Sequence, residues 1–255
     1  MMPQRTENGL RTTEISLQLV ELLVKHDGAT LGELADETDL ARSTIHNHLQ
    51  TLAHYGYVVR ENNIYRVGLK LHHLGDYARK QNEVYDIAKR IVTDLAEETE
   101  LEVDFTVEEN GRTVALYDAT SYSDSPSFIV DGRLFHMHNT ASGKSILAEY
   151  PETRITEILD QWGLPSETEQ TITTRDELFA DLERTRERGY AINEEEAIEG
   201  LWAVSKVVKD RLGRVRGSLN VCGPTYIHTD EREKTIVSQL DKKIEAFERS
   251  IAERS

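Results

Sequence analysis

The sequence predicts an α+β protein: an N-terminal winged helix-turn-helix, a connecting helix, and a C-terminal domain with an antiparallel sheet. Three observations support this prediction. Amphipathic helical segments and a short hairpin fill the first seventy residues, strands and helices alternate after residue 100, and a long amphipathic helix closes the chain. We expect the winged domain to span residues 1–69, the connecting helix 70–82 and the second domain 83–255.

The first two helices are predicted from their caps and apolar spacing. The segment TTEISLQLVELLVKH places its isoleucine and leucines on one helical face, with Thr13 as the predicted N-cap and Asp27-Gly28 as the end. In TLGELADETDL, Thr30 is followed three residues later by Glu33, which is the spacing of a capping box. A short turn then leads to a third helix.

The third helix, within ARSTIHNHLQTLAHYGYV, is predicted to run from Arg42 or Ser43 to about Tyr55, with Gly56 ending it. Ile45, Leu49, Leu52 and Ala53 recur at the spacing of a buried helical stripe. The opposite face is polar and suits contact with base edges in the major groove of DNA. The predicted base-contacting residues are Ser43, Thr44, His46, Asn47 and Gln50, with Arg42 on phosphate.

A hairpin follows the third helix directly. Residues 58–59 precede a polar turn at residues 61–63, and residues 64–67 return as the second strand. Three helices and a two-stranded wing together indicate a winged helix-turn-helix. We expect the wing residues Arg60 and Arg66 to meet the DNA backbone or the minor groove. A small helical interaction domain without DNA binding is the alternative.

Residues 70–99 are predicted to form two helical pieces, with a break between Gly75 and Asn82. The first piece is the connecting helix, and the second begins the C-terminal domain. A helical connector between a DNA-binding module and an acidic body is also a natural place for a homodimer to form.

The C-terminal domain is predicted as an antiparallel sheet with interspersed helices. Val103, Phe105 and Val107 alternate before an Asn110-Gly111 turn, which indicates a hairpin. A second strand pair is expected about Asp131-Gly132. Helices are expected from TASGKSILAEY, near residues 153–162 and 175–188, and at about residues 229–252, with the strands YAIN, LWAVSKVVKD and VRGSLNVCG.

Charge is distributed unevenly along the chain. The net charge is -16, from 30 Lys+Arg and 46 Asp+Glu, yet the first eighty residues carry 9 basic and 10 acidic residues. This split indicates a nucleic-acid-facing module attached to an acidic body. The acidic surplus, with arginines twice as frequent as lysines, resembles proteins of salt-accumulating halophiles. In molar salt the Debye length is only about 3 Å, so overall negative charge repels DNA very little beyond contact.

The sequence favours a cytoplasmic protein. Its N-terminal stretch has no apolar signal-peptide core, no run approaches eighteen apolar residues, and Cys222 is its single cysteine. We therefore expect neither a disulfide framework within the chain nor a membrane partner.

Several motifs resemble those of the IclR family of transcription regulators. They are ASGKSILA at residues 141–148, RERGYA at 186–191, the acidic run Glu194–Glu196 with Gly200, and Gly223-Pro224. The resemblance covers nearly the whole chain. It implies a GAF-like C-terminal domain that binds a small organic effector, and a homodimer or dimer of dimers on a double-stranded DNA operator. Trp202 and Lys206 depart from the family's usual strand, so the identity of the effector is not implied.

The resemblance also implies where the effector binds. In the family, ligand contacts cluster on the ASGK turn, on the segment after GYA and on the last strand before Gly-Pro. The matching positions are Ala141, Ser142, Asn193, Glu195, Leu201, Ala203, Asn220 and Cys222. Backbone N–H groups at the start of the helix at 140–144 favour an anionic group such as a carboxylate. Organic acids, sugar-derived and aromatic metabolites are the expected effector classes, and Trp202 is expected to face away from the cavity.

Other chemistries fit the sequence less well. The SGKS at residues 142–145 lacks the phosphate-loop glycine, because His138 holds its position. His136 and His138 share a strand face, but no third metal ligand stands at a useful spacing. Cys222 lies in an apolar strand without a neighbouring histidine. The run Glu194–Glu196 is interpreted as a solvated turn, and a role in shaping a pocket is the alternative.

We therefore expect no catalytic site, no metal and no cofactor. The predicted function is a sequence-specific DNA-binding transcription regulator whose operator binding is modulated by a small metabolite. The alternative is a GAF-like metabolite-binding sensor or enzyme whose N-terminal module mediates protein contacts only.

Overall fold

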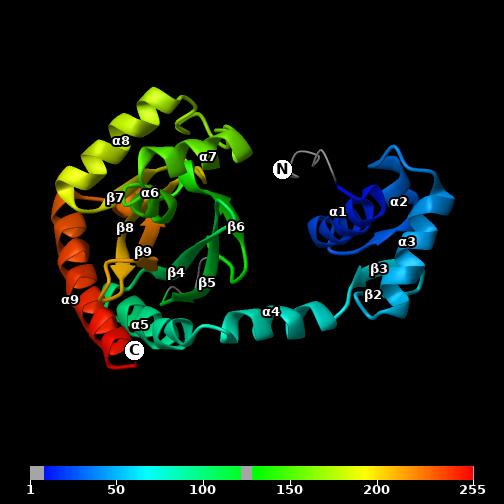
Figure 1. The fold of residues 1–255 in the computed structure, drawn as a ribbon, viewed down its shortest axis with the longest axis horizontal. Coiled ribbons are helices and arrows are strands. Elements are labelled where there is room, and N and C mark those ends of the chain that lie inside the picture. Colours follow the sequence, from blue (N-terminus) through cyan, green and yellow to red (C-terminus); the bar gives the residue numbers. More distant parts are fainter. Residues whose placement is uncertain (1–8, 122–127, 255) are drawn as a thin grey trace. The chain divides into compact units, whose positions relative to one another are not determined.

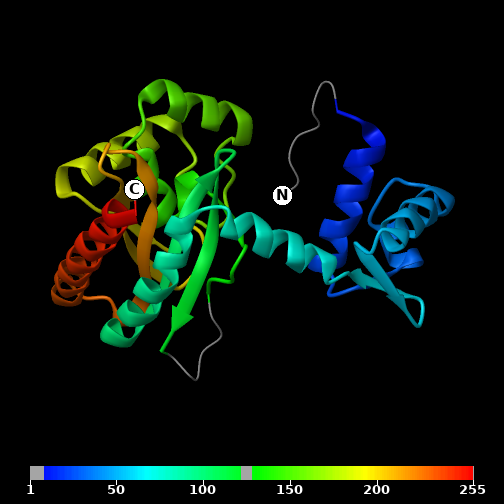
Figure 2. The ribbon, with the colours of Figure 1, turned by 60° about the horizontal axis from the view of Figure 1, so that its bottom comes forward.

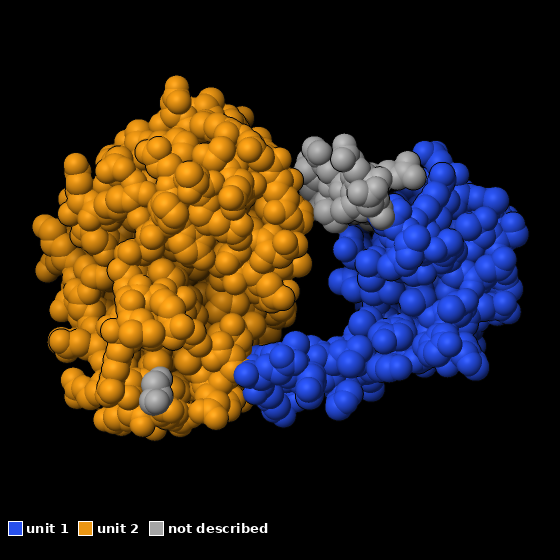
Figure 3. All heavy atoms as spheres, viewed as in Figure 1, with its two compact units in different colours: residues 1–81 blue, residues 82–255 orange. Residues whose placement is uncertain are grey.

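A computed structural model describes residues 9–121 and 128–254 of the chain. These residues divide into two compact units, residues 1–81 and residues 82–255, coloured separately in Figure 3. Residues 1–8 of the predicted winged domain lie outside the described residues, as do residues 122–127 and 255.

The first unit is a winged helix-turn-helix followed by one further helix (Figure 1). Its three packed helices are α1 (Arg11–Lys25), α2 (Leu31–Asp36) and α3 (Arg42–His54). The wing is β2 (Val58–Glu61) and β3 (Ile64–Val67), and the short β1 (Ala29–Thr30) pairs with β3 on its other side. Leucine, isoleucine, valine and tyrosine side chains from all of these elements form one core.

Local capping explains most of these boundaries. The capping box is confirmed, because Thr30 accepts the Glu33 N–H and the Glu33 carboxylate accepts the Thr30 N–H at 2.7 Å. Asn62 and Asn63 both have positive φ, as a tight two-residue hairpin turn requires. The predicted cap at Thr13 is wrong: α1 begins at Arg11, and its N-cap is Leu10, which provides no capping side-chain hydrogen bond.

Helix α4 (Lys70–Lys80) ends the first unit, and α5 (Glu83–Thr99) opens the second. The break falls at the late end of the predicted interval, because the Asn82 side chain accepts the Val84 N–H at 3.1 Å and so starts a new helix. Gly75 stays inside α4. Among the described residues, no side chain of α4 is buried.

The second unit is built on one six-stranded antiparallel sheet in the order β6-β5-β4-β9-β8-β7. The strands are β4 (Glu102–Glu109), β5 (Arg112–Thr120), β6 (Leu134–His136), β7 (Ala191–Glu194), β8 (Leu201–Lys209) and β9 (Val215–Pro224). The helices are α6 (Ala141–Leu147), α7 (Glu152–Trp162), α8 (Arg175–Arg188) and α9 (Asp230–Arg254), with short 3-10 turns at Met137–Asn139 and Thr225–Ile227. This confirms the α+β class.

Helices cover both faces of the sheet (Figures 1 and 2). Helices α5 and α9 pack on one face, over a large core that includes Phe105 and Trp202. Helices α6, α7 and α8 lie on the other face. As predicted, Trp202 points away from the α6 side and into the core beneath α5 and α9. Its ring stacks on His228, with 4.3 Å between the ring centroids.

The strand pair expected about Asp131-Gly132 is half wrong. Only residues 134–136 form a strand, while residues 128–130 are irregular. The reason lies in Glu102, whose carboxylate accepts the backbone N–H groups of Phe128 and Ile129 at 2.9 and 2.7 Å. A side chain thus occupies the N–H groups that a strand ladder would use. No helix in the described ranges is long and apolar enough to cross a membrane.

Candidate functional site

The solvent-facing side of α3 is polar. Ile45 and Leu49 are fully buried beneath the helix. Of the predicted base-contacting residues, Ser43, Asn47 and Gln50 are exposed together with Arg42, while Thr44 and His46 are partly exposed. The structure therefore places these six side chains off the core.

Contacts along its inner side hold α3 against α1. The His48 ring nitrogen Nδ1 and the Ser16 hydroxyl lie 2.8 Å apart, so this histidine is turned toward α1. The Thr51 hydroxyl donates to the Asn47 backbone carbonyl at 2.9 Å, and the Asn47 side chain is exposed. An exposed amide on a fixed helix suits bidentate contact with an adenine edge.

The two wing arginines are held by the domain itself. Arg60 donates to the Asn63 side chain, and its guanidinium carbon lies 5.4 Å from the Tyr65 ring centroid. Arg66 donates to the Asp27 carbonyl. Its side chain packs against Gly28 so closely that a Cβ at Gly28 would lie 2.9 Å from it. Arg66 therefore also fixes the wing to the end of α1.

A cavity that is partly open to solvent lies in the second unit on the α6 side of the sheet. Its wall is formed by residues from all six strands of the sheet, from the irregular segment before β6, from the start of α6 and from the loop after β7. The lining residues are Asp104, Thr106, Thr113, Ile129, Phe135, Thr140, Ala141, Ser142, Asn193, Ala197, Ile198, Leu201, Ala203 and Asn220.

The structure brings six of the eight predicted effector positions into this lining: Ala141, Ser142, Asn193, Leu201, Ala203 and Asn220. Cys222 and Glu195 do not line it. Cys222 is buried beside Ala203 in the sheet, where burial raises the pKa of its thiol well above the usual value. Glu195 has a positive φ, and its carboxylate accepts the Gly200 N–H at 2.7 Å, so it closes the loop before β8.

The most polar feature of the cavity is Asp104, which sequence reasoning missed. Asp104 stands directly opposite Asn220 in the β4–β9 ladder. Its carboxylate accepts the Thr106 hydroxyl and the Asn220 side-chain amide, both at 2.6 Å. Complete burial raises the pKa of Asp104 to about 7. The sequence pattern singled out only the alternating Val103, Phe105 and Val107 on this strand, yet helices cover both faces of the sheet (Figure 1).

The remaining lining residues that were missed are Thr106, Thr113, Ile129, Phe135, Ala197 and Ile198. Strand alternation could have identified Thr106, since it lies two residues beyond Asp104 on the same face of β4. The others come from β5, β6 and irregular segments, whose positions depend on tertiary packing.

The ASGK turn is held by its own cap. The Thr140 hydroxyl accepts the Gly143 N–H at 3.0 Å. Contrary to the expectation, this N–H is therefore not available to an anionic ligand. A Cβ at Gly143 would lie 2.2 Å from the Met137 carbonyl oxygen, which explains the glycine. Helix α6 has only seven residues.

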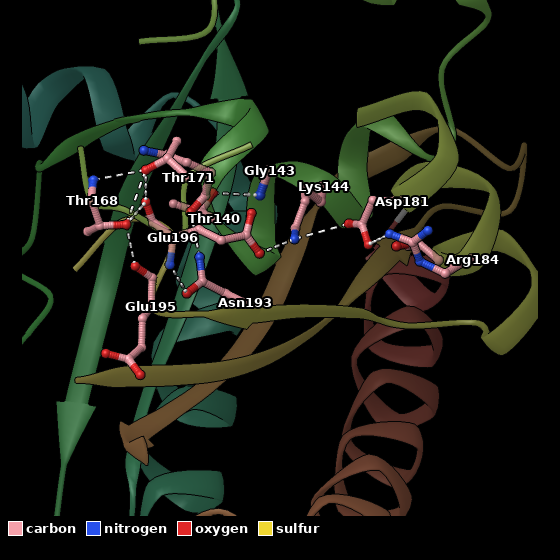
Figure 4. Close-up of polar contacts among 12 residues, drawn as sticks. Thr140, Gly143, Lys144, Thr168, Thr171, Asp181, Arg184, Asn193, Glu195 and Glu196 are labelled. Carbon is pink, nitrogen blue, oxygen red and sulfur yellow. Dashed lines mark hydrogen bonds and ion pairs between the residues drawn. The ribbon is translucent and has the colours of Figure 1, made fainter. Parts of the chain in front are cut away.

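A buried ion cluster joins α6, α8 and the loop after β7 (Figure 4). The Lys144 ammonium pairs with the Glu196 carboxylate and with Asp181 at 3.0 Å, and its side chain is 2% exposed. Arg184 reaches the other oxygen of Asp181 at 3.0 Å. Burial raises the pKa of Glu196 despite the neighbouring lysine. The interpretation of residues 194–196 as a solvated turn is therefore wrong for Glu196.

The same cluster positions the loop that carries Ala197 and Ile198. The Glu196 N–H donates to the Asn193 side chain at 3.3 Å, and the Glu196 carbonyl accepts the Thr171 hydroxyl at 2.6 Å. The Thr168 hydroxyl bonds to the Glu195 carbonyl at 2.7 Å (Figure 4). Side chains and backbone thus hold this loop at the cavity wall.

The paired histidines are neutral at neutral pH. Burial lowers the pKa of both His136 and His138 to about 4. The His138 ring nitrogen Nε2 lies 3.2 Å from the Pro165 carbonyl oxygen, so it serves the packing of the loop before α8. Over residues 9–121 and 128–254, no group of three or more His, Cys, Asp or Glu side chains is arranged to hold a metal.

Comparisons with known proteins agree for both units. Residues 12–62 match the IclR helix-turn-helix domain, and residues 77–249 match the IclR C-terminal domain of bacterial transcriptional regulators. The chain is 30% identical to the probable HTH-type transcriptional regulator ArcR of Halobacterium salinarum, over 88% of each protein. It is 30% identical to the HTH-type transcriptional regulator KdgR of Escherichia coli, over 82% of this chain and 80% of that one.

The fold has been solved in related proteins. The crystal structure of the Thermotoga maritima IclR matches with a TM-score of 0.74 and 26% identity, covering 95% of this chain and 99% of that one. The polar face of α3 and the cavity of the second unit thus fall within the two matched domains. The chain belongs to the IclR family: it is a DNA-binding transcription regulator with an N-terminal helix-turn-helix domain and a C-terminal ligand-binding domain.

Proposed function

We propose that this regulator binds its operator through α3 and the wing, and that a small organic metabolite in the cavity of the second unit modulates that binding. The observation that carries the proposal is the cavity, because six of the eight positions implied for effector contact line it. We further propose that the chain acts by binding alone, without catalysis or a cofactor.

In this proposal α3 enters the major groove. Asn47 and Gln50 contact base edges together with Ser43, Thr44 and His46, while Arg42 contacts phosphate. Arg60 and Arg66 meet the backbone or minor groove beside them. Because both arginines are already held by their own domain, the wing is pre-organised before DNA arrives.

We also propose that the regulator binds DNA as a homodimer, or as a dimer of dimers, and that the dimer forms through α4. Leu69, Leu74 and Tyr77 are 86%, 41% and 64% exposed, which is unusual for large apolar side chains so close together. A two-fold dimer requires an operator with two related half-sites. Light scattering of the full-length protein tests this step, since a monomer at micromolar concentration would contradict it.

The DNA-binding role is tested with an operator selected from randomised duplexes by the full-length protein. Asn47→Ala is expected to weaken binding to the selected site by about 1–3 kcal/mol and to relax preference at one base pair. Arg66→Ala is expected to weaken binding to all duplexes about equally. Affinities are measured by fluorescence anisotropy at fixed salt.

Gln170→Ala serves as the matched control, because Gln170 is an exposed amide in the other unit. It is expected to leave operator affinity unchanged. Unchanged affinity in both Asn47→Ala and Arg66→Ala would remove α3 and the wing from the proposed interface. Ala203→Phe, which fills the cavity, is expected to keep operator affinity, because the DNA-binding domain is a separate unit.

A further inference from the structure

The polar end of the cavity presents hydrogen-bond acceptors. Asp104 uses two of its lone pairs on Thr106 and Asn220, which leaves acceptor capacity on both carboxylate oxygens. Asn220 is 5% exposed and turns its amide N–H toward Asp104, so its carbonyl oxygen Oδ1 faces the other way. This oxygen has no hydrogen-bond partner among the described residues. A buried acceptor without a partner needs a donor from a ligand or water.

Among the described residues that line the cavity there is no lysine, arginine or histidine. The negative charges of Glu102 and Asp118 both act on Asp104 and raise its pKa, in addition to the effect of burial. Lys144 lies in the buried ion cluster, where Glu196 and Asp181 already neutralise it. An anionic ligand end at Asp104 would therefore meet like charge with no counter-charge to offset its desolvation.

The rest of the wall suits a compact molecule with apolar C–H surfaces. Phe135, Ile129, Ile198 and Leu201 supply apolar contact, and Ala203 leaves the space open. Thr113 and Ser142 add hydroxyl groups that can donate or accept. A ligand with both hydroxyl groups and C–H surfaces fits this wall. Its hydroxyl groups can donate to the acceptors at one end, and its C–H groups can pack against the aromatic ring.

We propose that the effector is a small, uncharged, polyhydroxylated molecule, and that Asp104 and Asn220 accept hydrogen bonds from two neighbouring hydroxyl groups of it. This inference rests on the proposed function of the cavity as the effector site. It selects the sugar-derived class among the effectors expected from sequence and excludes the carboxylate class at this end. Asp104 is then the residue that determines specificity.

The test uses four probes that share a three-carbon skeleton: 1,2-propanediol, lactate, 1-amino-2-propanol and 2-propanol. Binding to the full-length protein is measured by saturation-transfer NMR at pH 8, where Asp104 is mostly ionised. The diol is expected to bind best, and 2-propanol, which lacks one hydroxyl, about tenfold or more weakly because a hydrogen bond to a charged acceptor is lost. Lactate is expected not to bind the wild type.

Two variants complete the test. Asp104→Asn keeps the shape but removes the charge, so lactate binding is expected to rise relative to the diol. Ala203→Phe fills the cavity and is expected to abolish the signal of every probe; Ala203→Leu replaces it if circular dichroism shows misfolding. Stronger binding of lactate than of the diol to the wild type would overturn the proposal. Stronger binding of the amine would overturn it in favour of a cationic ligand.

The outcomes separate this proposal from the one on which it rests. If the probes bind the wild type and the cavity-filled variant equally, or bind neither, the cavity is not a ligand site and both proposals fail. If the probes bind only when the cavity is open but prefer lactate, the effector site stands and the polyhydroxyl class is wrong.

Discussion

Asp104 couples the cavity to the stability of the second unit. Burial raises its pKa from 3.8 to about 7, so the folded state holds this proton more tightly than the unfolded chain does. The contribution of Asp104 to the free energy of unfolding is therefore fully present below pH 4 and is lost as the pH rises through about 7. The loss amounts to at most about 4 kcal/mol, at 1.36 kcal/mol for each pKa unit.

We predict that Asp104→Asn removes this pH dependence. The difference in the free energy of unfolding, variant minus wild type, is expected to grow more positive between pH 4 and pH 8. Urea titrations followed by fluorescence at several pH values measure it. The difference is needed because His136 and His138, with pKa values lowered to about 4, act in the opposite sense and lose stability as the pH falls below 6.5. A pH-independent difference would contradict the buried position of Asp104.

The sequence correctly predicted the surroundings of a side chain where its position along a helix or strand decides whether it is buried and which face it lies on. Ile45 and Leu49 were assigned to the core from helical spacing, and Trp202 to the far face from strand alternation; both are confirmed. Asp104 was missed by the same logic, because alternation distinguishes two faces but does not tell which of them helices cover. Glu195 was placed at the cavity, yet its left-handed backbone turns it to Gly200.

At the scale of elements, local chemistry fixed most boundaries. The capping box of α2, the Asn62-Asn63 turn and Gly189 at the end of α8 each act within a few residues, and each is visible in the sequence. Residues 128–130 could not be assigned in this way. Their conformation depends on Glu102, which is distant in sequence and takes their N–H groups.

The pairing of α6 with the loop after β7 is also a long-range effect, and it yields a prediction. Lys144→Met leaves the buried Glu196 carboxylate without a cation, while Asp181 keeps Arg184. We expect the variant to lose about 3–5 kcal/mol of unfolding free energy. Adding Glu196→Gln removes the unpaired charge and is expected to recover part of that loss. Denaturant unfolding of the wild type, the two single variants and the double variant measures both effects.

Arg154→Met is the control for this cycle, because Arg154 forms its ion pairs on the surface and exposed pairs contribute about 1 kcal/mol or less. Equal costs for Lys144→Met and Arg154→Met would show that the Lys144 cluster is not sequestered from water. Full additivity in the double variant would show that Lys144 and Glu196 are not coupled.

At the scale of the whole molecule, the acidic surplus falls on residues 81–255, which hold 21 basic and 36 acidic residues. In dilute buffer these carboxylates repel one another, and the compact state bears that cost. At molar salt the Debye length shrinks to about 3 Å, so repulsion between separated surface charges is screened. The core and the buried Lys144 cluster are screened much less, because they are not in contact with the solution.

We therefore predict that salt stabilises this protein. Its melting temperature is expected to rise steadily from 0.1 M to 2 M KCl, and folded structure is expected to be lost on dilution. Circular dichroism across the KCl series measures this for the full-length protein. The isolated first unit, if it folds, is expected to respond much less, because its basic and acidic residues nearly balance. A melting temperature independent of salt in the full-length protein would show that the acidic surface is not an adaptation to molar salt. An equal rise in both proteins would indicate a general salting-out effect on burial in place of screened repulsion.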